Sequence, residues 1–594
     1  MGSARARNCL HRPPCAVCSA VTIWHCTLPG PLPLSAICRS GGFPPSFAPS
    51  MLRLLRPDRL AAFFFLPLLG ALQAWALADA QGQPNWWAQL LALGGFFLFL
   101  DGSRSPWQAA WRGWWFAACW LAAAFAWLYT SMHVFGGLPA PLAVAGVAAL
   151  AGALALYYGV AAVLYWYARV HGYLGSAVVF AACWTLAELA RGQWLTGFPW
   201  GAIGYAHVDG PLAPLARWVG VYGIGAVAAL AAALLGLSLA AVPGYIFGRF
   251  IHVARLPVSA PRLLSPLLWL GALTAGLHYG GQWQAAQWAQ ADAALAQRPP
   301  VRLALLQGNI PIAEKFDPST GVMDSLNWYG RQFLERKESL VIAPETAIPV
   351  LERDLPSSYL EVVTAPYRSG QQALLTGLPL GDAASGYTNS VAGIRPGEPD
   401  YVYSKSHLVP FGEFVPPMFQ WFNDLMNIPL DSFSRGLPVQ PSFAWQGERF
   451  APNICYEDLF GEELARRFAD PSQAPTVLVN FSNIGWFGDG VVIDQHLHIS
   501  RMRALELERP MVRATNTGAT AIIDHRGQVQ ARAERASVQV LSGQVRGVGQ
   551  AGEADSITPY ARWAGHAGLW PLWGLALCTL LLVPIVMRRL PRMA

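Results

Sequence analysis

Charged residues are scarce in this sequence of 594 residues. Asp, Glu, Lys and Arg together make up 13% of the chain, whereas hydrophobic residues make up 54%; an ordinary soluble protein has about 25% charged residues. This composition excludes a disordered chain, a coiled coil and a wholly soluble enzyme. The net charge of +6 is small for the length and comes from no basic block, which argues against nucleic acid as a partner. A membrane protein is the interpretation that remains.

The few charges are also unevenly distributed. Residues 60–281 contain 12 charged residues in 222 positions, whereas residues 301–548 contain 48 in 248. Water cannot solvate most of the first region, while the second has the composition of a soluble domain. We therefore expect a transmembrane domain of seven helices at 51–281, a linker at 282–300, a globular domain at 301–548, and a last membrane helix with a cytoplasmic tail at 549–594.

Eight stretches are apolar and close to the length that a helix needs to cross the bilayer, about 20 residues. They are Leu60–Ala78, Trp86–Leu100, Trp114–Met132, Pro141–Trp166, Gly175–Ala190, Trp218–Val242, Leu263–Tyr279 and Leu569–Met587. Basic residues in short loops mark the cytoplasmic side. With eight spans, 12 arginines fall on one side, and only Arg191 and Arg217 fall in short loops on the other. This asymmetry predicts that the globular domain lies on the outer side of the membrane.

The loop between Arg191 and Arg217 is rich in Gly, Pro and aromatic residues. Its residues Trp194, Phe198 and Trp200 suit either a re-entrant lid or an aromatic belt at the membrane interface, and both interpretations stay open. Glu188 lies within an apolar stretch and is a functional candidate for that reason. We expect it instead to lie at the wet end of its span, beside Arg191.

The first fifty residues carry five of the nine cysteines. Cys15 and Cys18, with His11, have the spacing of half a zinc site, but the second pair of ligands is missing. Met51 is followed by an arginine-containing segment and an apolar run, as at the start of a membrane protein. We interpret residues 1–50 as a mis-called start or an untidy extension, and we expect no metal and no cofactor.

From Val301 onward, short apolar runs alternate with helical patterns. Eight runs, beginning at Val301, Ser339, Ala373, Tyr387, Phe450, Thr476, Met511 and Thr520, predict strands, and helices are predicted at Asp324–Lys337, Glu462–Phe468 and Asp494–Glu508. Strand–helix alternation with nearly continuous apolar strands predicts a layered α/β domain with buried sheets.

Three residues at predicted strand ends could carry chemistry: Glu345, Lys405 and Cys455. A thiol reacts as thiolate, so it needs a base or a nearby cation. A buried glutamate can take the thiol proton, and a lysine can stabilise an oxyanion. The alternatives are a core cysteine, a turn glutamate and a surface lysine. Only three lysines occur among 41 basic residues, which favours a specific role for the lysine in this apolar, proline-containing segment.

The segments around these residues resemble a known family. PETAIP at Glu345, YSKSHLVPFGEFVP at Lys405 and NICYEDLF at Cys455 resemble the Glu-Lys-Cys triad of the nitrilase, or carbon–nitrogen hydrolase, superfamily. Together with the predicted spans and the segments LTGFPWGAIGYA, LLQGNIP and SNIGWFGDG, they resemble the apolipoprotein N-acyltransferase family of the bacterial inner membrane. The resemblance extends from about Met51 to Met587.

The resemblance implies an αββα sandwich and acyl transfer on the periplasmic side. Glu345 would be the general base, Cys455 the nucleophile and Lys405 the stabiliser of the oxyanion. A phospholipid, phosphatidylethanolamine in this family, would donate the acyl chain through a thioester, and the amine of an S-diacylglyceryl apolipoprotein cysteine would accept it. Glu413, Tyr456 and Glu457 would support the site, and aromatic residues would contact the acyl chain: Phe316, Trp486 and Phe487.

Two positions depart from the family pattern. Lys315-Phe316 stands where a Trp commonly follows the lysine, so an aromatic face remains but the indole N–H does not. Ile484 replaces an acidic residue in the segment SNIGWFG. Neither departure touches the triad. We also predict lids at Phe411–Phe433 and Gly485–Val492, with loop packing on the sheet as the alternative.

Two other functions fit parts of the sequence. A membrane-anchored nitrilase-type amidase would use the same three residues, but it gives no reason for so large an apolar half. A transporter with an outer regulatory domain would need charged or broken helices in mid-membrane, and the predicted spans contain few ionisable residues apart from Glu188.

Overall fold

The computed structural model describes residues 57–170, 172–244, 260–416, 433–549 and 553–589. They all lie within one unit of the chain, Pro57–Ala594. The interpretation of residues 1–50 and most of the predicted lid at 411–433 fall outside the described residues.

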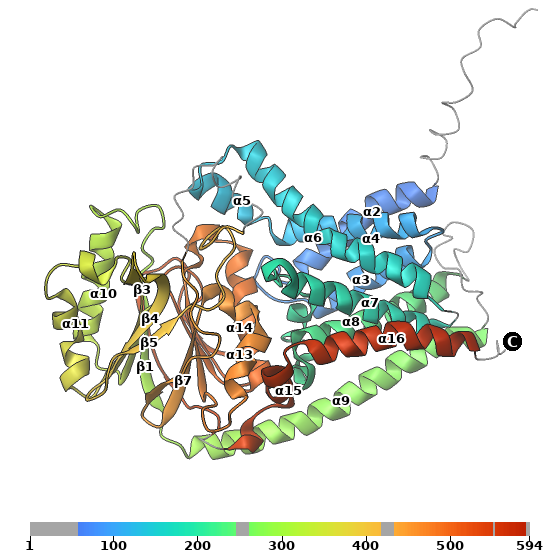
Figure 1. Cartoon of the computed structure of the whole chain (residues 1–594). Helices are drawn as coiled ribbons and strands as arrows, with labels where there is room; N and C mark the ends of the chain where they lie inside the picture. Colours follow the sequence, from blue (N-terminus) through green and yellow to red (C-terminus); the bar gives the residue numbers. More distant parts are fainter. Residues whose placement is uncertain (1–56, 171, 245–259, 417–432, 550–552, 590–594) are drawn as a thin grey trace, which may run out of the picture. The chain divides into compact units, whose positions relative to one another are not determined.

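Long helices form the apolar half, and each of the eight predicted stretches lies largely in helix (Figure 1). Their bounds are α2 Pro57–Trp75, α3 Trp86–Asp101, α4 Pro106–Ala124, α6 Ala140–Ala168, α7 Tyr173–Gln193, α8 Ala216–Gly244, α9 Ala260–Ala296 and α16 Trp570–Arg589. Among the described residues, four helical segments are long and apolar enough to cross a membrane: Ala140–Ala168, Tyr173–Thr196, Ala213–Ala240 and Trp570–Arg589. A bent pair, Pro106–Ala124 with Leu128–Phe135, would make a fifth. A membrane domain is therefore supported, while eight spans remain a prediction.

The span predicted at Trp114–Met132 is bent. Helix α4 ends at Ala124, and α5 (Leu128–Thr130) with the π-helical turn η1 (Ser131–Phe135) continues at an angle of 62°. The bend places Trp127 against the globular domain, where its indole Nε1 donates to Gln495 Oε1 at 3.3 Å. Helix α9 also differs from expectation, because it continues through most of the predicted linker to Ala296.

Glu188 does not lie at a wet end. Its side chain is 1% exposed and that of Arg191 is fully buried, with 4.0 Å between Arg191 Nη2 and Glu188 Oε1. The carboxylate also accepts the main-chain N–H of Ile203, which donates at 2.9 Å from the loop after α7. The pair thus fastens that loop to its helix. Within the same loop Trp194 is exposed, whereas Trp200 is buried and donates to Gln495.

Two six-stranded sheets form the globular domain, in the orders β12-β1-β2-β3-β4-β5 and β11-β10-β9-β8-β7-β6. In each sheet the three central strands are parallel, β1-β2-β3 and β7-β8-β9, and antiparallel strands flank them. The strand bounds are β1 Val301–Gln307, β2 Leu340–Ile342, β3 Ala373–Asp382, β4 Gly386–Ile394, β5 Tyr401–Ser404, β6 Phe443–Trp445, β7 Glu448–Ile454, β8 Val477–Ser482, β9 Met511–Thr515, β10 Ala521–Ile523, β11 Val529–Arg532 and β12 Gln539–Val545.

The sheets pack face to face because the central strands are apolar on both sides. Along β1, Leu303 and Leu305 point into the core shared with the second sheet, whereas Ala304 and Leu306 point to the opposite face, as the two-residue period of a strand requires. Helices α10 (Gly321–Glu335) and α11 (Tyr359–Ser369) cover that opposite face. Helices α13 (Gly461–Ala465) and α14 (Val491–Leu507) cover the second sheet, which completes the layers of a nitrilase-like fold (Figure 1).

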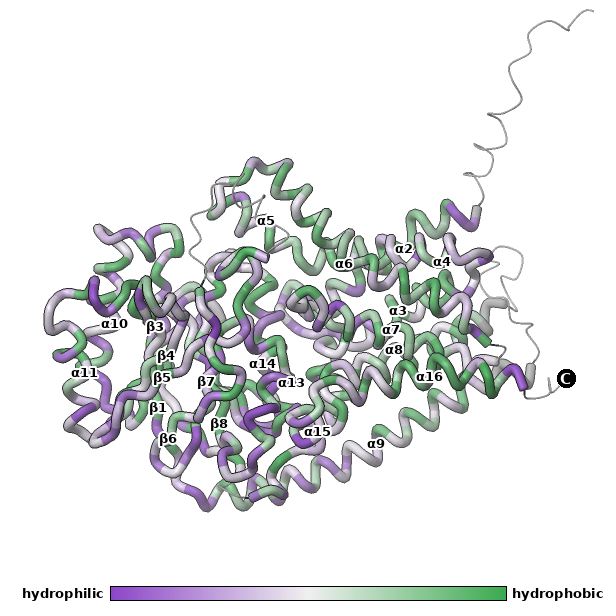
Figure 2. Tube along the Cα trace, in the orientation of Figure 1, coloured by the Kyte–Doolittle hydropathy of each residue, from purple (hydrophilic) through white to green (hydrophobic). Residues whose placement is uncertain are grey.

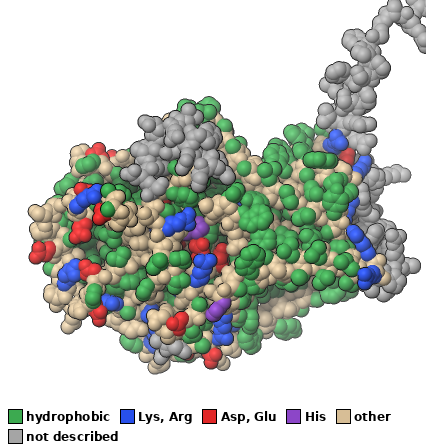
Figure 3. All heavy atoms as spheres, in the orientation of Figure 1, with side chains coloured by type: hydrophobic (Ala, Val, Ile, Leu, Met, Phe, Trp, Pro, Cys, Tyr) green, Lys and Arg blue, Asp and Glu red, His purple; other side chains and the backbone are tan. Residues whose placement is uncertain are grey.

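Helix α14 also joins the globular domain to the apolar half. It packs against α8, and Glu506 accepts the main-chain N–H of Val221 at 2.6 Å. Figure 2 shows the difference in hydropathy between the two halves, with α16 among the most hydrophobic segments. On the face shown in Figure 3, hydrophobic side chains cover much of the apolar half and Lys or Arg side chains line its far edge.

The sequence patterns predicted the strands better than the boundaries of the helices. All eight predicted strands are present, and the helices predicted at Asp324–Lys337 and Asp494–Glu508 begin three residues earlier than expected. The helix predicted at Glu462–Phe468 is α13 followed by the short 3-10 helix η8 (Arg466–Phe468). Strands β5, β6, β11 and β12 and helix α11 were not predicted.

The packing of β1 gives a first prediction. Leu303→Ala removes side-chain volume from between the two sheets, so we expect a loss of about 2–5 kcal/mol in the free energy of unfolding. Arg302→Ala, at the one exposed position of the same strand, should change it by less than about 0.5 kcal/mol. The thermal midpoints of the purified variants in detergent test this. Equal midpoints for the two variants would contradict the two-sided packing of β1.

Candidate active site

Glu345, Lys405 and Cys455 each follow the carboxyl end of a strand: β2, β5 and β7 respectively. Pro344 keeps the chain extended before Glu345, and Thr346 after it turns with a φ of 49°. Gly377 on the neighbouring strand β3 leaves room for this turn, because a Cβ there would lie 2.4 Å from the Pro344 carbonyl oxygen. The two sheets thus bring residues far apart in the sequence to one point.

The Lys405 ammonium lies between two carboxylates. Its Nζ is 2.9 Å from Glu413 Oε1 and 3.6 Å from Glu345 Oε1. The lysine side chain is 1% exposed and each glutamate side chain 11%, so the three charges are held largely out of water. The structure therefore places the Glu413 carboxylate next to the Lys405 ammonium, as the sequence predicted.

Asn389 on β4 holds the two carboxylates together. Its Nδ2 donates to Glu345 Oε1 and to Glu413 Oε1, both at 2.8 Å. Sequence reasoning missed this residue. The available signal was a buried amide in the middle of an apolar strand, since buried polar groups need partners.

Cys455 occupies a strained turn between β7 and the 3-10 helix η7 (Cys455–Leu459). Its φ of 52° is in the left-handed region that non-glycine residues rarely adopt, and such strain is common at functional positions. The side chain is partly buried and packs against both the inter-sheet core and the core on the α14 side. The His496 imidazole Nε2 lies 3.3 Å from the Cys455 carbonyl oxygen.

Burial and charge set the protonation of the three groups. Burial raises the pKa of the Cys455 thiol to about 12, with a further increase from Glu345 and an opposing effect of Lys405. Burial also raises the pKa of Glu345, against the effect of Lys405. Burial alone would lower the pKa of Lys405, but the carboxylates of Glu413 and Glu345 outweigh it and raise that pKa. The resting thiol is therefore protonated, and a base has to remove its proton during reaction.

Glu457 ties the turn after Cys455 to the loop after Lys405. One carboxylate oxygen accepts the main-chain N–H and the hydroxyl of Ser406, both at 2.7 Å. The other accepts the main-chain N–H of Ile454 at 2.7 Å and the Tyr403 hydroxyl at 2.8 Å. Glu457 thus fixes the spacing between the nucleophile strand and the lysine strand.

Tyr456, the residue after the candidate nucleophile, points toward the apolar half. Its hydroxyl donates to the Gly197 carbonyl oxygen at 2.9 Å, and its ring packs on Phe198 with 6.4 Å between centroids. Burial raises the pKa of this phenol, so it stays a hydrogen-bond donor. The loop after α7 therefore sits directly against the turn that carries Cys455.

Aromatic side chains from three segments form an exposed stack beside the site. Phe316 is 48% exposed and stacks on Trp486, with 6.2 Å between ring centroids. Trp486 also meets Phe135 of the bent pair edge-on at 5.9 Å, and Phe487 meets Trp127 at 4.6 Å. The three aromatic residues predicted for the acyl chain thus lie where the globular domain meets the apolar half.

Lys315 is a further buried cation that sequence reasoning did not place in the site. Its side chain is fully buried, and its Nζ donates to the Glu345 carbonyl oxygen at 3.3 Å. Burial lowers its pKa to about 7, against an increase from Glu345. The rarity of lysine in this chain was the signal that could have found it.

Comparisons with known proteins match both halves of the chain. Residues 69–234 match the apolipoprotein N-acyltransferase N-terminal domain, and residues 302–551 match the carbon–nitrogen hydrolase family. An apolipoprotein N-acyltransferase of Verminephrobacter eiseniae is 52% identical over 495 residues, which cover 82% of this chain and 89% of that protein. A protein of the same name from Ralstonia nicotianae is 41% identical over 504 residues, covering 83% and 88%.

A carbon–nitrogen hydrolase from Helicobacter pylori G27 is among the solved structures that match part of this chain. The match covers 41% of this chain and 89% of that one, at 15% identity and a TM-score of 0.32.

The charges of the site predict that removing Lys405 and removing Glu345 have opposite effects on the reactivity of the Cys455 thiol. Lys405→Met removes the cation that lowers the pKa of Cys455, and Glu345→Gln removes a charge that raises it. A change of about one pKa unit alters the thiolate fraction roughly tenfold at pH 8. We expect iodoacetamide to alkylate Cys455 more slowly than in the wild type in the first variant and faster in the second, as measured by peptide mass mapping. The exposed Cys578 is the internal control, and a change in the same direction in both variants would contradict this electrostatic arrangement.

Proposed function

The chain belongs to the apolipoprotein N-acyltransferase family, and we propose that it transfers an acyl chain from a phospholipid to the N-terminal amine of apolipoproteins. The donor is phosphatidylethanolamine and the acceptor amine is that of an S-diacylglyceryl cysteine. One observation carries the proposal: Lys405 Nζ lies within 3.6 Å of Glu345 and 2.9 Å of Glu413, and all three charges act on the Cys455 thiol.

In the first step, Glu345 removes the thiol proton as Cys455 Sγ attacks the carbonyl carbon of the phospholipid ester. The oxyanion that forms is stabilised by the Lys405 ammonium. The carbon–oxygen bond to the glycerol then breaks, and Glu345 returns the proton to the departing oxygen. The products are a Cys455 thioester and a lysophospholipid. The raised pKa of Glu345 supports this role, since a general base works best with a pKa near the working pH.

In the second step, the neutral amine of the apolipoprotein attacks the thioester carbon. Glu345 takes a proton from the attacking nitrogen, Lys405 again stabilises the oxyanion, and the carbon–sulfur bond breaks to give an amide. The proton passes to the Cys455 sulfur and restores the resting enzyme. A thioester is reactive enough for this exchange and has to be protected from water.

The supporting residues act through the geometry described above. Glu413 holds Lys405 from the side opposite Glu345, and Glu457 fixes the distance between the loops that carry Lys405 and Cys455. Tyr456 holds the nucleophile turn against the loop after α7. Phe316, Trp486 and Phe487 contact the acyl chain, and the segment Gly485–Val492 that carries the last two acts as a lid.

The membrane setting follows from both substrates, which carry acyl chains that water does not dissolve. We propose eight spans, with the membrane domain at 51–281, a linker at 282–300, the catalytic domain at 301–548 and the last span within 549–594. The catalytic domain then lies on the periplasmic side of the bacterial inner membrane. The exposed aromatic stack at the junction of the two halves supports access from the bilayer.

An acyl adduct is the direct test of the first step. We expect purified protein incubated with phosphatidylethanolamine alone to gain the mass of one acyl chain, and the Cys455→Ala variant to gain none. Intact-mass spectrometry measures both. An adduct that persists in Cys455→Ala would remove this cysteine from its role, and an adduct that water rapidly clears without any acceptor would favour the amidase alternative.

A charge-preserving substitution tests the role of Lys405. The guanidinium of Lys405→Arg keeps the positive charge but does not fit the 2.9 Å contact with Glu413 in a fully buried position. We expect turnover to fall at least a hundredfold, since loss of one oxyanion-stabilising group costs about 10²–10³ in kcat. Lys337→Arg, at an exposed position, is the matched control. Near-normal turnover in Lys405→Arg would contradict the need for a compact ammonium.

A further inference from the structure

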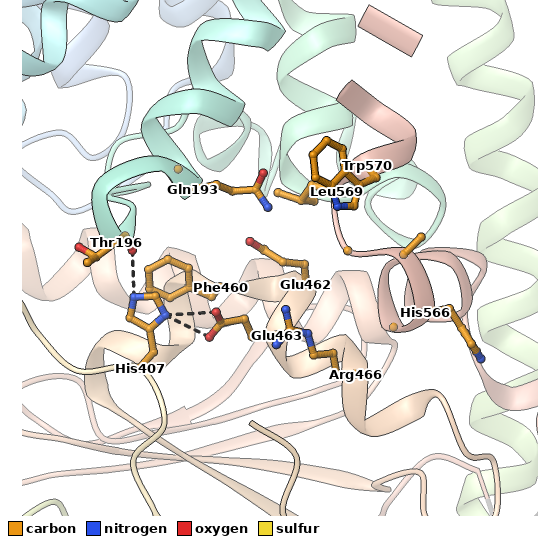
Figure 4. Close-up of a pocket in the computed structure, with 14 residues that line it drawn as sticks. Gln193, Thr196, His407, Phe460, Glu462, Glu463, Arg466, His566, Leu569 and Trp570 are labelled. Atoms are coloured by element: carbon orange, nitrogen blue, oxygen red, sulfur yellow. Dashed lines mark hydrogen bonds and ion pairs between the residues drawn. The ribbon is translucent and has the colours of Figure 1, made fainter. Parts of the chain in front are cut away.

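A cavity separate from the proposed triad lies where the globular domain meets the ends of two apolar helices. Its volume of about 380 Å³ falls within the roughly 300–1,000 Å³ of typical ligand sites. Its walls come from the end of α7, from the segment Phe460–Arg466 and from the connection between α15 (Pro559–Ala567) and α16 (Figure 4). None of the three triad residues lines it.

Glu462 is the most buried carboxylate among the residues that line this cavity. The residue is 5% exposed, and no other residue in the described part of the chain donates a hydrogen bond to its carboxylate or pairs with it at ion-pair distance. Figure 4 shows the carboxyl group directed into the cavity, on the side of Gln193. Burial raises its pKa to about 7, with a further increase from Glu463. Its own main-chain N–H donates to this carboxylate, but a buried negative charge that faces no cation is costly, and a cation in the cavity would stabilise it.

The neighbouring groups give the cavity a second acidic wall and a basic edge. Glu463 Oε2 is 3.1 Å from His407 Nδ1, and the other ring nitrogen of His407 lies 3.1 Å from the Thr196 carbonyl oxygen. Phe460 stacks on the same imidazole with 3.6 Å between centroids. Arg466 is exposed at the edge, within reach of solvent. A ligand that carries both a cation and an anion would thus find opposite charges here, the carboxylates for its cation and Arg466 for its anion.

The position of the cavity at the ends of two candidate membrane spans indicates that such a ligand comes from the bilayer. Two candidate membrane spans end beside it, Tyr173–Thr196 and Trp570–Arg589. Their ends carry exposed indoles: Trp570 is 77% exposed, and Trp194 stacks on Trp573 at 5.7 Å. Tryptophans at span ends mark the level of the lipid head groups. Beyond them, α16 presents exposed side chains such as Leu575 and Leu581, along which acyl chains can lie.

We propose that this cavity binds the head group of a phospholipid with a primary ammonium, held by Glu462 and Glu463, with its phosphate at Arg466. The bound lipid is not the acyl donor at Cys455, so this site goes beyond the proposed transfer reaction. A primary ammonium can donate up to three hydrogen bonds to the paired carboxylates. An anionic lipid without an amine leaves Glu462 unsatisfied and adds repulsion.

The test measures lipid binding without turnover. The full chain carrying Cys455→Ala is purified in detergent and titrated with phosphatidylethanolamine or phosphatidylglycerol, and native mass spectrometry counts the bound lipids. We expect Glu462→Gln to weaken the binding of one phosphatidylethanolamine molecule about tenfold, the size expected for one charge-assisted contact. Binding of phosphatidylglycerol should not weaken. Glu361→Gln, an exposed position on α11, is the matched control and should change neither titration.

Two further measurements, with Arg466→Gln and with an unlipidated peptide amine, distinguish a lipid site from the alternatives. Arg466→Gln changes only an exposed side chain, and we expect it to weaken the binding of phosphatidylethanolamine at this site. Unchanged phosphatidylethanolamine binding in both Glu462→Gln and Arg466→Gln, or an equal loss of both lipids in Glu462→Gln, would overturn the proposal. Binding of an unlipidated peptide amine that depends on Glu462, without such dependence for the lipid, would make the occupant a protein and contradict a lipid site. Because Cys455 is absent throughout, the result is independent of the acyl adduct predicted above.

Discussion

The ammonium of Lys405 between two buried carboxylates is the interaction on which the site depends. Removed from water, the Glu345 and Glu413 carboxylates would repel one another. Lys405 and the shared amide of Asn389 offset that repulsion. The arrangement keeps a charged base next to a thiol that is itself protonated at rest. In the proposed reaction, the reactivity of the thiol therefore depends on this group of charges rather than on the cysteine alone.

Most strands of the globular domain and the residues of the candidate site could be predicted from the sequence, because short local patterns mark them. Apolar runs ended by turn residues gave eight of the strands, and motif resemblance gave the residues at their ends. The antiparallel strands β5, β6, β11 and β12 were missed since they are short or partly exposed, with few apolar residues to mark them. Asn389 was missed because its partners lie 44 and 24 residues away, a distance that no local pattern reports.

Two features of the apolar half depend on contacts outside the helix concerned. The apolar composition of Trp114–Met132 predicted a span but not its bend, beyond which Trp127 donates to Gln495 of the globular domain. Glu188 was expected in water beside Arg191, but the returning loop supplies an N–H and buries both. Lys315 is a different omission. The rarity of lysine was applied to Lys405 alone, although the same reasoning identifies the second buried ammonium next to Glu345.

The contacts between the halves also decide what the apolar helices do beyond anchoring. The loop after α7 touches the site at two points: the Gly197 carbonyl accepts from Tyr456, and the Thr196 carbonyl lies beside His407. His407 follows Lys405 by two residues, and its main-chain N–H donates to Glu457 at 3.2 Å, the carboxylate that also holds the nucleophile strand. A group that fills the cavity at Glu463 thus acts on an imidazole joined to both catalytic loops. A short chain of packed and hydrogen-bonded groups would in this way connect the proposed lipid site to the loops that carry Lys405 and Cys455.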